Sequence, residues 1–111
     1  MQQTPVRAET EDTTSAATVQ LIGNRGGRIT IGVEAIDENG AAITPDAGTV
    51  AITIDSGVLS DFTPLGGAGE VSLVSPEPIV SAGNIRRVRA TPSDLAGTGV
   101  VGIRLKVWEH P

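Results

Sequence analysis

The feature that most constrains this chain is a strict two-residue alternation close to its C-terminus. Apolar residues occupy every second position over residues 101–107, and Arg104, Lys106 and Trp108 take the alternate positions. Successive side chains of a β-strand point to opposite faces of a sheet, so the pattern predicts a strand with one buried and one outer face. A second run, residues 85–90, precedes it across the glycine-bearing connection TPSDLAGTG. We expect these two runs to pair as the final hairpin of the fold.

The same period and the turn residues divide the rest of the chain into further short strands. The clearest covers residues 49–55, in which Val50, Ile52 and Ile54 share one face. Residues 37–40, Asp-Glu-Asn-Gly, form the strongest turn signal, because Asn and Gly tolerate positive φ. Other strands are expected at 18–22, 28–37, 41–44 and 70–74.

About seven short strands separated by turns predict an all-β fold, namely an antiparallel β-sandwich of jelly-roll or immunoglobulin-like type, or a flattened barrel. The 14 Gly and 7 Pro residues are spread through the chain and disfavour long helices. Ile36 interrupts the alternation of its strand, so we expect a bulge near Gly32 or Ala35. Ser93 or Asp94 could cap one helical turn over residues 93–96.

The 111 residues predict a single domain, preceded by a polar segment without periodicity. We expect residues 1–15 to be a flexible N-terminal arm, with a short extended piece at residues 5–8, and residues 16–111 to be the sandwich domain. The arm is either a frayed tail or a segment that docks on an adjacent subunit. No basic segment followed by an apolar run marks a signal peptide, and no apolar stretch has the roughly 20 residues of a membrane helix. We therefore expect a soluble protein made without export.

Charge is distributed unevenly along the chain. Residues 1–84 hold three basic and eleven acidic groups, giving −8, whereas residues 85–111 hold five basic and two acidic groups, giving +3. Such asymmetry can steer the acidic part of one copy toward the basic part of another, although edge strands also carry cations as protection against aggregation. We expect the paired final strands to present one cationic face that acids of the same chain or of a neighbour approach. The candidate partner-binding residues are Arg86, Arg87, Arg89, Arg104, Lys106, Glu9, Glu11 and Asp12.

No residue pattern predicts catalysis, a cofactor or nucleic-acid binding. His110 is the single histidine and is penultimate, which is a poor place for a general base. The turn acids, including Asp37 and Asp46, lack EF-hand spacing, so a calcium site at these turns stays an open alternative to simple turn chemistry. The glycine-rich residues 23–28 do not match a phosphate-binding loop, and only Phe62 and Trp108 could stack on bases.

Two stretches give the chain a family likeness. The ending IRRVRATPS, a glycine loop and VGIRLKVW, together with the polar start and VQLIGNRGGRITIGVEAID, resembles small accessory proteins of tailed-phage virions. The resemblance is one of composition, which is rich in Gly, Thr and Val and poor in aromatic residues. No functional residue of the family can be assigned to a position of this chain. The resemblance implies a capsid decoration (cementing) protein, or a head-fibre or tail component, in virions assembled in the host cytoplasm. Decoration proteins of such phages are commonly homotrimers, and the implied partner is the major capsid protein or another virion protein.

A different role is also compatible with the sequence. The chain could be an immunoglobulin-like binding module of a tail or surface protein that recognises a glycan or a receptor. Glycan sites usually need an exposed aromatic platform, and Trp108 is the residue that could supply it.

Overall fold

The computed structural model describes residues 6–21, 28–55, 63–64, 70–82 and 85–110. These residues contain ten strands and no helix. The strands are β1 (Val6–Glu9), β2 (Ala17–Gln20), β3 (Arg28–Ile36), β4 (Ala42–Ile43), β5 (Ala47–Asp55), β6 (Thr63–Pro64), β7 (Glu70–Ser72), β8 (Ile79–Ala82), β9 (Arg87–Ala96) and β10 (Gly102–His110). The sequence also predicts a turn at residues 24–27, from its Asn and Gly residues, and a long irregular connection at residues 56–68 in which Phe62 acts as an apolar plug. Residues 24–27 and Phe62 lie outside the described residues.

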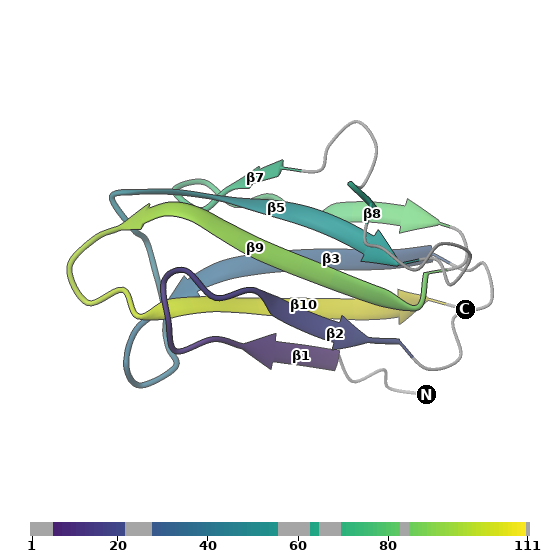
Figure 1. Cartoon of the computed structure of the whole chain (residues 1–111), viewed down its shortest axis with the longest axis horizontal. Coiled ribbons are helices and arrows are strands. Elements are labelled where there is room, and N and C mark those ends of the chain that lie inside the picture. The colour runs from purple at the N-terminus through teal and green to yellow at the C-terminus, as the bar shows by residue number, and fades with distance from the viewer. Residues whose placement is uncertain (1–5, 22–27, 56–62, 65–69, 83–84, 111) are drawn as a thin grey trace.

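The strands form two antiparallel sheets that pack face to face, which confirms the predicted β-sandwich. Sheet A has the order β1-β10-β3-β4, with β8 also paired to β3, and sheet B has the order β2-β9-β5-β6, with β7 also paired to β5. Figure 1 looks onto sheet B, with β10 and β3 of sheet A behind it. At most of its connections the chain crosses from one sheet to the other, so strands that follow each other in the sequence are seldom neighbours in a sheet.

The core is aliphatic, as the alternation predicts. The buried residues Val50 and Ile52 of β5 and Val88 of β9 meet Ile103, Leu105 and Val107 of β10 in one cluster. Branched aliphatic side chains suit such a half-buried pleated surface.

The predicted pairing of the last two strands is wrong. β9 lies in sheet B between β2 and β5, whereas β10 lies in sheet A between β1 and β3. Both strands have one apolar face. That face is buried in the core whether the two strands are neighbours in one sheet or lie in opposite sheets. The connection therefore spans the two sheets, and residues 97–101 make the turn between them.

The irregularities also differ from expectation. β3 pairs with β10 without interruption from Arg28 to Ile36, so it has no bulge. The register shift lies instead between β5 and β9, where Gly48 alone stands opposite two residues of β9, and one of these, Asp94, has φ of 56°. A β-bulge of this kind replaces the helical turn expected at residues 93–96.

The prediction of a flexible N-terminal arm over residues 1–15 is wrong for residues 6–10, which belong to the sandwich. Residues 6–9 form β1, an edge strand of sheet A in which Val6 to Glu9 pair with Val107 to Arg104 of β10. Thr10 is buried, its N–H donates to the carbonyl of Ile103 at 2.9 Å, and its hydroxyl accepts the Ile103 N–H at 3.0 Å. This part of the segment is ordered because β10 offers it a free edge, which the arm's own sequence does not reveal.

Candidate functional site

The candidate residues fall on two opposite outer faces, because β9 and β10 belong to different sheets. Arg87 and Arg89 alternate with buried Val88 and project from sheet B, whereas Arg104 and Lys106 project from sheet A. The single cationic face predicted for four of these residues does not exist. Each cation is instead met by its own local partners.

Arg104 ties three segments of sheet A together. Its Nε donates to Glu9 of β1 at 2.7 Å, its Nη1 donates to Glu34 of β3 at 2.9 Å, and its Nη2 donates to the carbonyl of Gly40. The hydrogen bond to Glu9 raises the pKa of Arg104, against the effect of partial burial, and the bond to Glu34 adds to the rise. Glu9 therefore approaches the basic strand as predicted, but within the same sheet and next to its own chain's arginine.

Lys106 shares this network. Its Nζ lies 3.4 Å from Oε1 of Glu34 and 5.6 Å from the centre of the Trp108 ring. Sequence reasoning missed Glu34, because its proximity depends on the β3–β10 register, in which it stands directly opposite Arg104. Charges of opposite sign placed in this way are a stabilising cross-strand pair.

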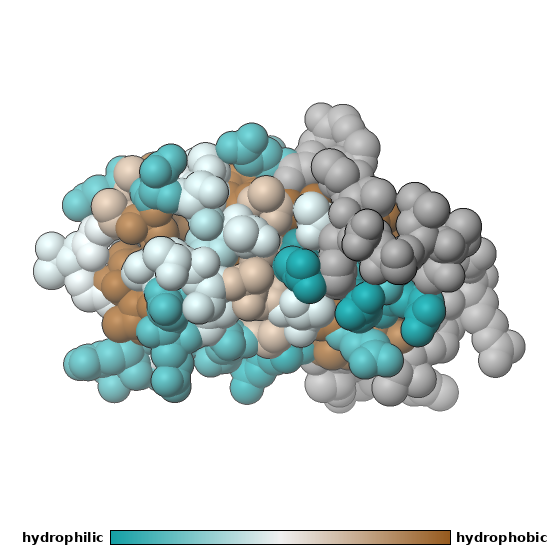
Figure 2. Space-filling model, viewed as in Figure 1, coloured by the Kyte–Doolittle hydropathy of each residue, from teal (hydrophilic) through white to brown (hydrophobic). Residues whose placement is uncertain are grey.

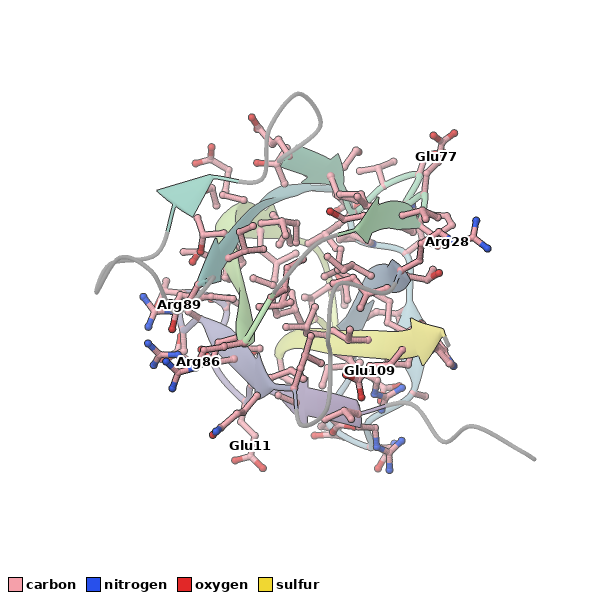
Figure 3. All side chains as sticks on the ribbon, turned by 90° about the vertical axis from the view of Figure 1, so that its right-hand side faces the viewer. Glu11, Arg28, Glu77, Arg86, Arg89 and Glu109 are labelled. Carbon is pink, nitrogen blue, oxygen red and sulfur yellow. The ribbon has the colours of Figure 1, made fainter. Side chains whose placement is uncertain are left out.

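On sheet B, Arg87 pairs with a carboxylate that sequence reasoning also missed. Arg87 Nη2 lies 2.7 Å from Asp55 Oδ2, and the Asp55 side chain is only 4% exposed. Arg89 contacts Thr18 Oγ1 through its Nε at 3.5 Å. Arg86 is exposed just before β9 and projects from the same side of the molecule as Arg89, as Figure 3 shows.

The acidic candidates beyond Glu9 lie in the connection after β1. Glu11 and Asp12 are exposed. Asp12 accepts hydrogen bonds from the backbone N–H and the hydroxyl of Thr14, both at 2.9 Å, and these bonds lower the pKa of the Asp12 carboxyl. Glu11 also borders a depression of about 320 Å³ that Asp37 and Glu38 line from the turn after β3.

Asp37 holds its own turn together. One oxygen of Asp37 accepts the N–H groups of Asn39 and Ala41, each at 2.9 Å, and Gly40 has the positive φ of 78° that the turn requires. Within the described ranges, no three His, Cys, Asp or Glu side chains gather as a metal site would need. No helix in those ranges is long and apolar enough to cross a membrane.

The outer face of sheet B carries small uncharged side chains on β5 and β9, bordered by Glu70 of β7 and by Arg89. Thr91 stands opposite Ala51, and Ser93 stands opposite Thr49. Figure 2 shows this face as a pale area of small, weakly polar side chains, with hydrophilic groups toward its borders. Protein interfaces have a similar distribution, in which charged residues are depleted at the centre and polar groups form the rim.

Comparisons with models of protein families and with curated protein sequences give no match. Among solved structures, the Yersinia pseudotuberculosis-derived mitogen has a similar fold, with a TM-score of 0.50 and 11% identity over 97% of this chain and 87% of that one. A chain of the acidic stable capsid structure of Helicobacter pylori bacteriophage KHP30 gives 0.43 and 13% over 98% and 88%. The exo-β-1,3-galactanase of Phanerochaete chrysosporium gives 0.31 and 16% over 96% and 27%. At these identities the likeness concerns the β-sandwich fold alone.

Proposed function

We propose that this β-sandwich is a non-enzymatic structural protein of a bacteriophage particle, which decorates or cements the capsid as a homotrimer. The virion assignment rests on the resemblance of the N- and C-terminal stretches to phage accessory proteins. The major capsid protein is the proposed partner. No bound cofactor or nucleic acid is needed for such a role, which depends on surfaces that fit other protein copies.

The observation that carries the homo-oligomer is that a group of exposed acids and a pair of arginines lie at opposite ends of the long axis, which measures 40 Å against 20 Å for the shortest axis. The connections after β1 and β3, which hold Glu11, Asp12 and Glu38, lie at one end, at the left of Figure 1. β9 begins at the other end, next to Arg86 and Arg89. Opposite charges at opposite ends favour a contact between the acidic end of one copy and the cationic end of the next.

A contact between two different patches is heterologous, so it closes into a ring when the rotation permits. A ring of three copies would leave the weakly polar part of the sheet B face, around Ala51 and Thr91, available on every subunit. We propose that this face lies against the capsid. Its lack of central charge favours close packing, because few charged groups must lose water there.

The oligomer is tested by measuring the mass in solution with light scattering at low and high salt. We expect a trimer at low ionic strength that dissociates as screening shortens the range of surface charges from about 30 to 3 Å. The double variant Arg86→Glu/Arg89→Glu should be a folded monomer. The control Arg7→Glu, on an exposed residue of β1 that pairs with the middle of β10 and so lies away from the cationic end, should remain trimeric.

A charge swap makes the test specific. Adding Glu11→Arg and Glu38→Arg to the Arg86→Glu/Arg89→Glu variant should restore the trimer, because the sign of both ends is then exchanged. A wild-type monomer at all salt concentrations, or dissociation of the Arg7→Glu control as well as of the Arg86→Glu/Arg89→Glu variant, would contradict the proposed contact.

The virion role needs a separate measurement. Particles of the phage that encodes the protein should contain it in a fixed ratio to the major capsid protein, measured by quantitative mass spectrometry. Ala51→Arg, which places a cation at the centre of the sheet B face, should abolish particle binding and leave the trimer intact. Particles without the protein, or unaltered binding of Ala51→Arg, would refute the role or the docking face respectively.

A further inference from the structure

The outer face of sheet A carries the chain's single tryptophan in an unusual setting. Trp108 stands opposite Thr30 in the β10–β3 register, and its ring extends over Gly32, where a Cβ atom would lie 3.6 Å from Cζ3. The missing side chain at Gly32 thus lets the indole lie close to the backbone of β3. Trp108 is only partly buried, so some of the ring is accessible from outside the sheet.

A depression of about 200 Å³ adjoins this ring. Gly32, Glu34 and Lys106 line it from sheet A, and the segment Pro76-Glu77-Pro78, which precedes β8, lines its border. Glu77 is exposed and projects at the edge of the molecule in Figure 3. The depression therefore combines one aromatic surface with an ammonium group and two carboxylates.

We propose that this depression, the Trp108 groove, binds a pyranose unit of a neutral oligosaccharide with equatorial hydroxyl groups, such as β-linked glucose or N-acetylglucosamine. The C–H face of such a sugar is flat and apolar, and it suits contact with the accessible part of the indole. Its hydroxyls both donate and accept hydrogen bonds. Lys106 can donate to them, and the carboxylates of Glu34 and Glu77 can accept from them.

The surrounding groups favour a sugar over other ligands. Grooves that bind proline-rich peptides are lined by several aromatic residues, whereas this groove has one aromatic ring, which lies between three charged side chains and the apolar residues Val33, Pro76 and Pro78. A nucleic acid would meet the two carboxylates and a chain of net charge −5. The groove lies on sheet A, so it is separate from the sheet B face and does not depend on the proposed trimer or capsid contact.

Intrinsic fluorescence gives a direct test, because the chain has one Trp and no Tyr. The folded protein is titrated with cellopentaose, with the β-linked pentamer of N-acetylglucosamine, and with decaproline as a peptide probe. We expect a saturable change in Trp108 emission with at least one of the two sugars below about 10 mM, the range of weak single-site binding. No change with either sugar, or a change with decaproline alone, would overturn the proposal.

Two matched variants locate the site. Glu77→Gln should weaken sugar binding about tenfold, because it removes a charged acceptor from the groove. Glu70→Gln is an equally exposed carboxylate change on β7, outside the groove, and should alter affinity by less than about twofold. Neither change affects the core, so both variants should melt as wild type does. Equal effects of the two substitutions would contradict the assignment.

Discussion

Asp55 and Arg87 stand directly opposite each other on β5 and β9, and a salt bridge of 2.7 Å joins Arg87 Nη2 to Asp55 Oδ2. Arg87 Nε donates to the same oxygen at 2.8 Å. The Asp55 side chain is almost fully buried, whereas the Arg87 side chain is 38% exposed. Arg87 therefore stabilises its own chain, and reversal of its charge would test folding before it tested assembly.

Loss of this arginine should destabilise the protein. We expect Arg87→Ala to lower the free energy of unfolding by about 2–3 kcal/mol, somewhat less than for a fully buried pair, because water reaches the arginine side. Chemical denaturation measures the change. Arg86→Ala, one position earlier and exposed, should change stability by less than about 0.5 kcal/mol. Similar losses for both variants would show that the pair with Asp55 is unimportant.

The centre of the sandwich should not tolerate a charge. Ile52 of β5 and Ile103 of β10 are both 0% exposed. Ile52→Asp or Ile103→Asp buries a carboxylate in an aliphatic cluster, at a cost of several kcal/mol, so neither variant should fold. The measurement is soluble expression followed by a thermal melt. Ala51→Asp, on the exposed side of the same strand, is the control and should fold.

Two strand glycines should respond differently to one methyl group. A Cβ on Gly102 would clash with the carbonyl oxygen of Thr10, which is backbone and cannot move aside easily. Gly102→Ala should therefore displace the segment after β1 and lower the melting temperature by about 10 °C or more, the shift for roughly 2 kcal/mol in a domain of this size. Gly32→Ala meets only Trp108 at an ordinary contact distance and should melt near the wild-type temperature. If Gly32→Ala lowered the melting temperature more than Gly102→Ala does, the close approach of Gly102 to Thr10 would be contradicted.

The N-terminal segment should matter for folding as well as for assembly. The sequence alone predicts that residues 1–15 are dispensable for folding, but β1 pairs with β10 and Thr10 hydrogen-bonds with Ile103. A chain that starts at Thr14 loses these bonds and the Glu9 partner of Arg104, so we expect several kcal/mol of lost stability. Glu9→Gln alone should cost about 1 kcal/mol. A truncated chain as stable as wild type would show that β1 adds nothing.

Local sequence predicted the class of fold and the facing of individual strands. Val50, Ile52, Ile103 and Leu105 are buried as their alternation indicates, and the chain turns at Asp-Glu-Asn-Gly, where Gly40 but not Asn39 has positive φ. These features depend on backbone pleat and on single-residue φ preferences, which are properties of a few neighbouring residues.

The surface charges show where this reasoning ends. The five basic candidates could be named from the sequence. The acidic partners Asp55 of Arg87 and Glu34 of Arg104 could not, because each pair joins strands far apart in sequence. Asp55 gave one usable signal, because it is a carboxylate at the end of an alternating strand. If such a carboxylate is buried, a cation must pair with it.

By itself, then, the amino-acid sequence determined that the chain forms short strands, which side chains point inward and where the tightest turn lies. Only the tertiary structure decided which strands are neighbours. An alternating pattern indicates that one face of a strand is buried. That face is buried equally well if the strand pairs with the next strand in the sequence or if it lies in the opposite sheet and packs against it. That choice placed Arg87 beside Asp55 on one face and Arg104 beside Glu34 on the other.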